Sequence, residues 1–219
     1  MFKVDFHTHS STSPDGGITP EQYQAALDNG LLDVIAITDH NEISMAVALQ
    51  KQLGDQIIVG EEIMTTQGEI IGLFLTEKVP AGLDAHETVK RIKDQNGLVY
   101  IPHPFETVRK GMGPRTLDEI VDFVDVIEVC NGRAYVQNRS AQAVVWAKFS
   151  QKNGAASSDA HGYKGLGGTY SDLPEMPTRE NLLALLDRSV LRTKKASFQS
   201  LLYPRYHTIR KKLGRSNEH

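Results

Sequence analysis

One stretch near the start of the chain decides the fold: Val4-Asp5-Phe6-His7-Thr8-His9-Ser10. Apolar and polar residues alternate along it, which indicates a β-strand. Side chains two positions apart on a strand point to the same face, so His7 and His9 share one face. A turn-rich segment, residues 11–17, follows directly. Two imidazoles on one face at a strand end supply half of a tetrahedral metal site.

Downstream of this stretch, short apolar runs alternate with amphipathic segments. Residues 32–37 and 57–59 have almost no polar interruption, which is typical of strands buried on both faces of a parallel sheet. Further strands are predicted at residues 69–75, 98–101, 124–129, 155–158 and 167–173, the first of these forming a hairpin with residues 57–59. Helices are predicted at residues 20–29, 42–53, 87–95, 117–123, 138–151 and 178–186. In the first helix Thr19 and Gln22 form a capping box. This alternation indicates an α/β protein with a parallel sheet or barrel.

The length of 219 residues fits one large domain, which we place at residues 1–196. Residues 197–219 differ in composition and are predicted to form a basic C-terminal helix broken at Pro204. The basic residues of this tail are Arg205, Arg210, Lys211, Lys212 and Arg215. Two interpretations of the tail stay open, a solvated basic end and a segment that docks to an acidic partner.

Composition narrows the classes of protein. The net charge of −3 gives no general attraction to nucleic acid or to a membrane, and no apolar run is long enough to span a bilayer. Cys130 is the only cysteine, so an internal disulfide is excluded, and we expect it to pack in the core rather than to act as a nucleophile. The chain runs directly into its first strand without a leader, so we expect a cytoplasmic protein with no membrane partner. Composition says nothing about its oligomeric state.

Metal-competent side chains follow one predicted strand after another. In a parallel barrel these strand ends meet at one rim, where the active sites of such barrels lie. The residues are His7, His9, His40, Glu62, His103, Asp159 and His161. Each alone is more often a satisfied structural residue, but that explanation does not predict their convergence. Five imidazoles with several carboxylates exceed one zinc site and suit two or three ions bridged by carboxylates.

Further polar residues are expected at the same rim. Arg109 and Arg133 follow two of the strands, and a guanidinium group fits phosphate oxygens, although an exposed solvated arginine is an equal alternative. Asn131 is predicted either to bind substrate or to cap the next helix. Asp39 adjoins His40, and we expect it to support an imidazole rather than to bind metal directly.

The ordered set of motifs resembles the PHP family, the polymerase and histidinol phosphatase domain. The resemblance covers residues 1–172 and implies a distorted (β/α)7 barrel, a trinuclear metal centre and phosphoester hydrolysis. The matching stretches are His7-Thr8-His9, Asp15-Gly16, Thr38-Asp39-His40, Gly60-Glu61-Glu62, Pro102-His103-Pro104 and Ser158-Asp159-Ala160-His161.

The resemblance also implies a ligand set. The first ion would be held by His7, His9 and Asp159, and the third by Asp15, His40 and His161. Glu62, chosen over Glu61 because the family pattern is Gly-x-Glu, would bridge the first and second ions, and His103 would bind the second. Glu69 falls where many members have a further histidine, which could favour manganese or iron over zinc or leave the second ion weakly held. The small inserted domain of the nucleotide-hydrolysing members is not found in this chain.

We therefore predict a metal-dependent phosphoesterase that uses two to three divalent ions of manganese, iron or zinc. Its substrate would be a small phosphomonoester or a nucleotide or oligonucleotide end, attacked by a hydroxide that bridges two ions. The residues expected to act on the substrate are Asp15, His40, Arg109 and Arg133. Two alternatives stay open: an amidohydrolase-like hydrolase acting on a carbon centre, and a metal-stabilised binding domain without turnover.

Overall fold

The computed structural model describes residues 1–135, 137–194 and 198–215. Within them a nine-stranded sheet has the order β7-β6-β5-β4-β3-β2-β1-β8-β9. The strands are β1 (Phe2–Thr8), β2 (Val34–Ile37), β3 (Ile57–Thr65), β4 (Gly68–Leu73), β5 (Leu98–Ile101), β6 (Val126–Asn131), β7 (Asn153–Ser157), β8 (Thr169–Leu173) and β9 (Val190–Thr193). The helices are α1 (Pro20–Asp28), α2 (Ser44–Leu53), α3 (Ala85–Asp94), α4 (Pro114–Glu119), α5 (Ser140–Phe149), α6 (Leu182–Leu186) and α7 (Phe198–Arg215), with short 3-10 turns at Gly54–Gln56, Val121–Phe123 and Tyr163–Gly165.

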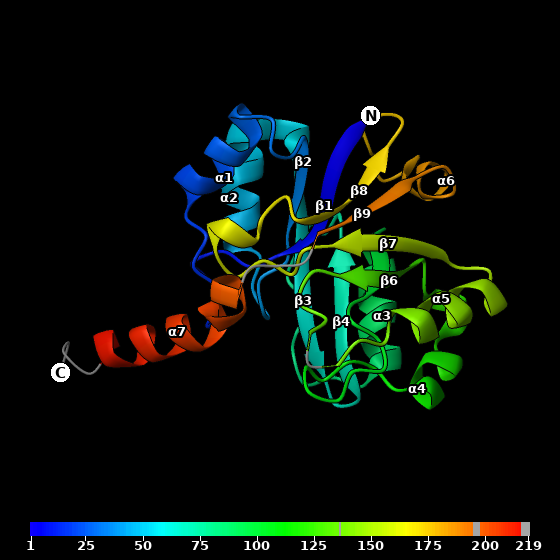
Figure 1. The fold of residues 1–219 in the computed structure, drawn as a ribbon. Coiled ribbons are helices and arrows are strands. Elements are labelled where there is room, and N and C mark those ends of the chain that lie inside the picture. The colour runs from blue at the N-terminus through cyan, green and yellow to red at the C-terminus, as the bar shows by residue number, and fades with distance from the viewer. Residues whose placement is uncertain (136, 195–197, 216–219) are drawn as a thin grey trace.

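The sheet curls until it nearly closes (Figure 1). At the seam, Thr8 at the end of β1 forms a parallel bridge with Ala160 after β7, and the His9 amide donates to the Ala160 carbonyl at 2.8 Å. Strands β1 to β7 therefore form the predicted (β/α)7 barrel. The barrel is distorted because β4 runs antiparallel to both neighbours, as the predicted hairpin requires, and because β8 and β9 are added antiparallel beside β1.

Apolar residues fill the barrel and the space around it. Val4 and Phe6 of β1 belong to an interior cluster with Tyr100, and leucines of α6 complete that cluster. A second cluster joins the outer face of the sheet to helices α1 to α5. In α1, the predicted capping box is confirmed: the Thr19 hydroxyl accepts from the Gln22 amide, and the Gln22 side chain accepts from the Thr19 amide.

A register shift in β1 directs the histidines inward. The pairing of β1 with β2 is irregular between Asp5 and Thr8. In a regular strand His7 would face away from the interior that Phe6 occupies, because neighbouring side chains alternate. The irregularity brings His7 to the interior as well, a use of bulges that is common beside functional sites.

Some predicted boundaries were wrong for local reasons. Helix α2 begins at Ser44 rather than Glu42, because the Glu42 carboxylate accepts the amides of Ile43 and Ser44 and so precedes the helix. Helix α6 begins at Leu182 rather than Thr178, because a side-chain turn between Thr178 and Asn181 comes first. Strand β9 was not predicted; it is short and largely exposed, so it lacks the apolar pattern of a buried strand.

The predicted break of the C-terminal helix at Pro204 was also wrong. Helix α7 runs through Pro204 from Phe198 to Arg215. A proline inside a helix removes one hydrogen bond and costs about 3 kcal/mol, which contacts with the barrel can offset. Residue 197 and residues 216–219 of the predicted tail lie outside the described residues. None of the described helices is both long enough and apolar enough to cross a membrane.

Candidate metal centre

The rim at the carboxyl ends of the parallel strands gathers every residue predicted as a metal ligand. Their contact distances and burial show that they form one centre, closed on the barrel side and open on the other. The centre comprises His7 and His9 from β1 and its end, Asp15 from the next loop, His40 after β2, Glu62 of β3, Glu69 of β4, His103 after β5, and Asp159 and His161 after β7.

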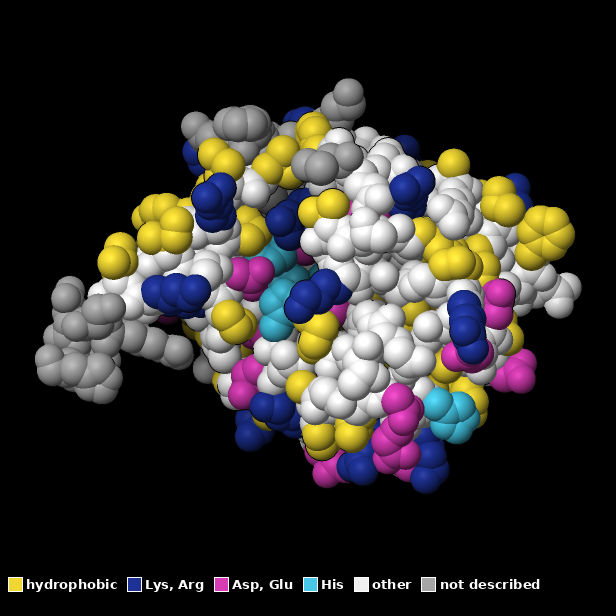
Figure 2. Space-filling model, turned by 90° about the horizontal axis from the view of Figure 1, so that it is seen from below, with side chains coloured by type: hydrophobic (Ala, Val, Ile, Leu, Met, Phe, Trp, Pro, Cys, Tyr) yellow, Lys and Arg dark blue, Asp and Glu magenta, His cyan; other side chains and the backbone are white. Residues whose placement is uncertain are grey.

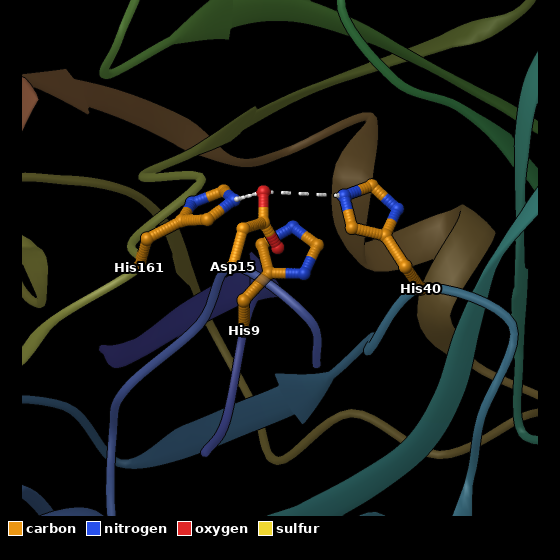
Figure 3. Close-up of side chains that lie close together, drawn as sticks. All are labelled: His9, Asp15, His40 and His161. Carbon is orange, nitrogen blue, oxygen red and sulfur yellow. Dashed lines mark hydrogen bonds and ion pairs between the residues drawn. The ribbon is translucent and has the colours of Figure 1, made fainter. Parts of the chain in front are cut away.

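These side chains form four overlapping groups, and within each group one ligand atom per residue lies within 4.8 Å of all the others. The groups are His7, His9 and Asp159; His7, Glu62 and His103; His40, Glu62 and Glu69; and His9, Asp15, His40 and His161. Figure 3 shows the last group, in which Asp15 Oδ2 lies 3.1 Å from His161 Nε2 and 3.7 Å from His40 Nε2. The shared members show that the groups are neighbouring parts of one centre.

Glu62 lies at the middle of the centre. Its Oε2 is 3.3 Å from His7 Nε2, 3.2 Å from His9 Nε2 and 3.2 Å from His40 Nδ1. Its Oε1 is 3.1 Å from the Nε2 of a fourth imidazole, that of His103. Burial by itself would raise the pKa of Glu62, but the neighbouring imidazoles of His7 and His40 outweigh it and hold the pKa well below its usual range. Glu62 is therefore an ionised carboxylate in contact with four imidazoles.

Glu61 faces away from the centre. Its Oε2 accepts the Val79 amide at 2.8 Å, and burial raises the pKa of Glu61 to about 7. Of the two adjacent glutamates, the geometry brings only Glu62 among the imidazoles.

Glu69 also reaches the centre. Its carboxylate lies 3.8 Å from His40 Nδ1 and 3.7 Å from His103 Nε2. Burial, followed by the negative charge of Glu62, raises the pKa of Glu69 to about 9. Two buried carboxylates this close repel each other unless a proton or a cation lies between them. The carboxylate thus occupies a position suited to an ion held jointly with Glu62.

The chemistry of the donor set fits divalent cations. The Nε2 atoms of His7 and His9 are 3.0 Å apart, and both imidazoles are fully buried. Burial, together with the charges of His9 and Arg133, lowers the pKa of His161 to about 3, so this ring is neutral. For His9, burial would lower the pKa, but contact with Asp159 and Glu62 outweighs burial and raises the pKa to about 9, so in the metal-free protein a proton occupies the place that a cation could take. Imidazole nitrogens facing carboxylate oxygens form the mixed ligand set typical of manganese, iron and zinc.

Glu128, a buried carboxylate in the interior of β6, was not predicted as part of the site. Its Oε2 accepts the His103 amide at 2.6 Å and the Asn131 side-chain amide at 2.8 Å. Its Oε1 lies 3.1 Å from the Tyr100 hydroxyl and 3.3 Å from His7 Nδ1. Glu128 therefore fixes two of the histidines from behind. The available signal was a single acidic residue inside the apolar run Val126-Ile127-Glu128-Val129.

The two predicted arginines have different surroundings. The Arg109 guanidinium bonds both Glu106 carboxylate oxygens at 2.7 and 2.8 Å, Asn131 Oδ1 at 2.8 Å and Asp159 Oδ2 at 2.5 Å. It is thus occupied by protein groups and holds Asp159; its partner Glu106 was not predicted. The Nη1 of Arg133 lies 3.3 Å from Asp159 Oδ1, and its buried Nε has no hydrogen-bond partner among the described residues.

Three other residues have supporting roles. The Asp39 carboxylate accepts hydrogen bonds from the Ser10 amide at 2.6 Å and the Ser10 hydroxyl at 2.5 Å. It therefore fixes the chain after His9, whereas the sequence predicted that it would support an imidazole. Asn131 bonds Glu128 and Asp159, which places it within the centre's support rather than at a helix cap. Cys130 is partly buried beside the core, and burial raises the pKa of its thiol, which disfavours a nucleophilic thiolate.

A cavity of about 370 Å³ opens above the centre. Its walls combine ligand residues with Pro14, Met64, Val108, Lys110 and Arg133. Figure 2 shows histidines at the bottom of this hollow and Lys or Arg side chains at its edge. Arg133, Asp159 and His161 also line an adjoining cavity of about 300 Å³.

Helix α7 holds the two loops that carry Asp15 and His161. The ring of Tyr203 lies against Gly162, and the ring of His207 lies against Gly17; a Cβ at either glycine would come within 2.5 Å of the ring. The Lys211 ammonium donates to the carbonyls of residues 11, 13 and 16, at 2.7 Å for the first and 2.8 Å for the last. The inner face of α7 is therefore a structural part of the centre.

Two curated proteins of Methanocaldococcus jannaschii are similar in sequence. The uncharacterized protein MJ1587 is 37% identical over 156 residues, covering 65% of this chain and 91% of that protein. The uncharacterized protein MJ0417 is 31% identical over 227 residues, covering 94% of this chain and 89% of that protein. No family model matches the chain.

Solved structures are similar in fold. A two-domain protein from Bacteroides vulgatus, described as containing a predicted PHP-like metal-dependent phosphoesterase, has a TM-score of 0.72 at 22% identity, covering 94% of this chain and 69% of that chain. PsfC from Pseudomonas syringae has a TM-score of 0.64 at 16% identity, with coverages of 96% and 98%. An amidohydrolase from Chromobacterium violaceum with bound sulfate has a TM-score of 0.62 at 17% identity, with coverages of 86% and 97%. At these identities the likeness establishes the fold.

Proposed function

We propose that this chain, which belongs to the same protein family as MJ1587 and MJ0417, is a metal-dependent phosphoesterase of the PHP type. The observation that carries the proposal is the convergence of five imidazoles and three further carboxylates around the buried Glu62, on the rim of a distorted barrel. The fold shared with a PHP-like metal-dependent phosphoesterase supports it.

The donor groups accommodate two to three divalent ions. His7, His9 and Asp159 would hold the first, and Asp15, His40 and His161 the third. Glu62, Glu69 and His103 would hold the second, since His103 Nε2 lies 3.1 Å from Glu62 and 3.7 Å from Glu69. Manganese, iron and zinc all suit this mixture of nitrogen and oxygen ligands. When bound, such ions lower the pKa of a coordinated water and neutralise the charge that develops on phosphoryl oxygens.

The protein itself orients the ligands. Glu128 accepts from Nδ1 of His7, which leaves the lone pair of Nε2 directed to the centre. Arg109 holds Asp159 in the same way from the other side. Preorganised carboxylates and dipoles of this kind avoid reorganisation during the reaction, because their cost is met on folding.

The substrate would bind at the open side of the centre. Arg133 and Lys110 line the cavity and provide positive charge for phosphate oxygens, while Met64 and Val108 provide an apolar wall. Asp15 and His40, each more than a fifth exposed, face the same cavity and would contact the substrate as well as an ion. A volume of about 370 Å³ suits a small phosphomonoester or the terminal unit of a nucleotide chain.

A direct test is to remove metal with a chelator and restore manganese, iron or zinc one at a time. Hydrolysis would be followed on an aryl phosphate, on nucleoside 3′- and 5′-monophosphates, on short oligonucleotides and on amide substrates. We expect phosphate ester hydrolysis that depends on added metal and is lost in His103→Ala. His86→Ala, at an exposed histidine of α3, is the matched control and should keep full activity.

The same panel decides between the proposal and its alternatives. Metal-dependent cleavage of amides without cleavage of phosphate esters would favour the amidohydrolase-like reaction. The fold of the amidohydrolase from Chromobacterium violaceum is also similar to that of this chain. Bound metal with no turnover of any substrate would favour a metal-stabilised binding domain. Either result would overturn the phosphoesterase proposal.

A further inference from the structure

Helix α7 carries an exposed row of large apolar side chains, which we call the apolar stripe. It consists of Leu202, Tyr206, Ile209 and Leu213, whose exposed fractions are 50, 56, 51 and 63%. Intervals of four, three and four residues place these side chains on one face of a helix. A continuous exposed apolar row of this kind marks an interaction surface more often than a scattered apolar residue does.

The opposite face of α7 is the one that contacts the barrel. Tyr203, His207 and Lys211, at intervals of four, lie against the loops that carry Asp15 and His161. The apolar stripe is therefore not needed to attach α7 to the rest of the chain. Figure 1 shows α7 projecting away from the barrel, which leaves its outer face open to a flat surface.

Basic residues border the apolar stripe on both sides. On a helical projection, Arg205 and Lys212 fall along one border and Arg210 along the other, and all three are exposed. Phe198–Arg215 contains five Lys and Arg residues and no Asp or Glu, within a chain whose net charge is −3. The modest net charge thus conceals a strongly basic helix.

We propose that the apolar stripe and its basic borders bind the surface of an anionic lipid bilayer, with α7 lying in the plane of the headgroups. Apolar side chains on one face with Lys and Arg on its borders are the pattern of interfacial helices. Arg205, Arg210 and Lys212 would contact anionic headgroups while the stripe enters the boundary with the acyl chains. The expectation of no membrane partner rested on the small net charge of the whole chain and on the lack of an apolar run long enough to span a bilayer. An interfacial helix requires neither a large net charge on the chain nor a spanning segment.

Two other binding partners, a second copy of this chain and a nucleic acid, explain the combination of apolar stripe and basic borders less completely. A second copy of α7 packed on the stripe would bring two basic helices together without an acidic residue between them, and like charges repel. A nucleic acid would use the basic borders but leave the apolar stripe in water. In Figure 2 the apolar and basic side chains of the projecting helix are visible from the same side as the histidine-lined hollow, so a bilayer bound there would lie near the mouth of the centre.

The test is flotation of the full-length protein with phosphatidylcholine vesicles, with and without phosphatidylserine. We expect binding only to vesicles that contain phosphatidylserine, and weaker binding as salt is added. Replacing Arg205, Arg210 and Lys212 together by Gln should lower the partition coefficient by about a hundredfold, since each charge near the surface contributes a factor of about five. Replacing Leu202, Ile209 and Leu213 by Ser should abolish binding.

Matched controls separate the surface from general stickiness. Phe149→Ser, at an exposed aromatic residue of α5, and Arg115→Gln, at an exposed arginine of α4, should leave binding unchanged. All variants should keep the far-ultraviolet circular dichroism and the aryl phosphatase activity of the parent, because the stripe does not contact the centre. The membrane inference can therefore fail while the proposed activity stands, and the reverse.

Three results would overturn the inference. The first is equal binding to neutral and anionic vesicles. The second is a protein that does not bind vesicles but forms a dimer, detected by sedimentation equilibrium, which becomes a monomer when Leu202, Ile209 and Leu213 are replaced by Ser. The third is a protein that binds a polynucleotide but not vesicles. In this case the Ser replacements in the apolar stripe would keep polynucleotide binding, and the Gln replacements of the three basic residues would lose it.

Discussion

The substitution Glu128→Gln tests how the centre is held together from behind. One Glu128 oxygen faces the Tyr100 hydroxyl and His7 Nδ1, and the other faces the His103 amide and the Asn131 side-chain amide. A glutamine can keep its oxygen toward the His103 and Asn131 amides, and its NH2 group then faces the Tyr100 hydroxyl and His7 Nδ1 and can no longer accept from either. Two of the four contacts donated to the carboxylate are therefore lost. Hydrogen bonds to a charged group contribute about 1.5–3 kcal/mol each, so the free energy of unfolding should fall by about 3–5 kcal/mol.

Both stability and metal affinity should change. For a chain of this length such a loss lowers the melting temperature by about 10 °C. Carboxylates that orient metal ligands typically contribute about 10–100-fold to affinity, so the variant should bind manganese more weakly by about that factor. Thermal unfolding of the metal-free protein and titration against a chromophoric chelator measure the two effects separately.

Asp172→Asn is the matched control, since Asp172 is also a buried carboxylate on a strand but pairs with Arg192 away from the centre. It should leave metal affinity unchanged. A Glu128→Gln protein that binds metal as tightly as the parent, and melts at the same temperature, would refute the orienting role of Glu128.

Three further predictions concern the loops, the pH dependence and the substrate. Lys211→Met removes three hydrogen bonds to the loop after β1 and should lower the bound metal by up to one ion per chain, as measured by elemental analysis. Lys212→Met is the control and should leave the metal content unchanged. Equal metal content in the two variants would contradict the role of Lys211 in holding this loop. Burial raises the pKa of Asp5 to about 7 from an ordinary value of 3.8, so the folded metal-free protein retains a proton that the unfolded chain releases. Its stability should therefore decrease by about 2–3 kcal/mol from about pH 5 to about pH 7, and urea unfolding of Asp5→Asn should lack this component; an unchanged pH dependence would disprove it. Arg133→Ala should raise KM for an aryl phosphate by about tenfold or more with a smaller change in kcat, and an unchanged KM would remove Arg133 from phosphate binding.

The residues brought together by the fold could largely be predicted from where they stand along the chain. His40, His103 and His161 each come directly after an apolar run, and parallel strands place such positions at one rim. The prediction of a barrel is also confirmed. It could be made because the burial of the strands and the alternation of strands and helices can be recognised from local sequence patterns.

The supporting carboxylates could not be predicted in this way. Glu128 and Glu106 act through partners that are distant in sequence or lie in irregular loops, and no periodic pattern marks them. The role of Asp39 was misjudged because its partner, Ser10, lies on a neighbouring loop rather than beside His40. The shift that turns His7 inward arises from pairing between β1 and β2, so it is a tertiary property.

The C-terminal helix illustrates a second limit. Its basic composition and Pro204 suggested a broken, solvated end. Whether a proline breaks a helix depends on what the helix contacts, and here Tyr203, His207 and Lys211 attach α7 to the loops of the centre. Sequence periodicity alone shows two faces of the helix but not which one contacts the barrel.

The most direct test of the central claim is the metal content of the untreated protein, measured together with aryl phosphate hydrolysis before and after chelation. We predict two to three ions of manganese, iron or zinc per chain, activity that is lost with the metal, and recovery when one of these metals is restored. A protein that binds no metal after reconstitution, or that hydrolyses the ester equally well in the presence of chelator, would contradict the account.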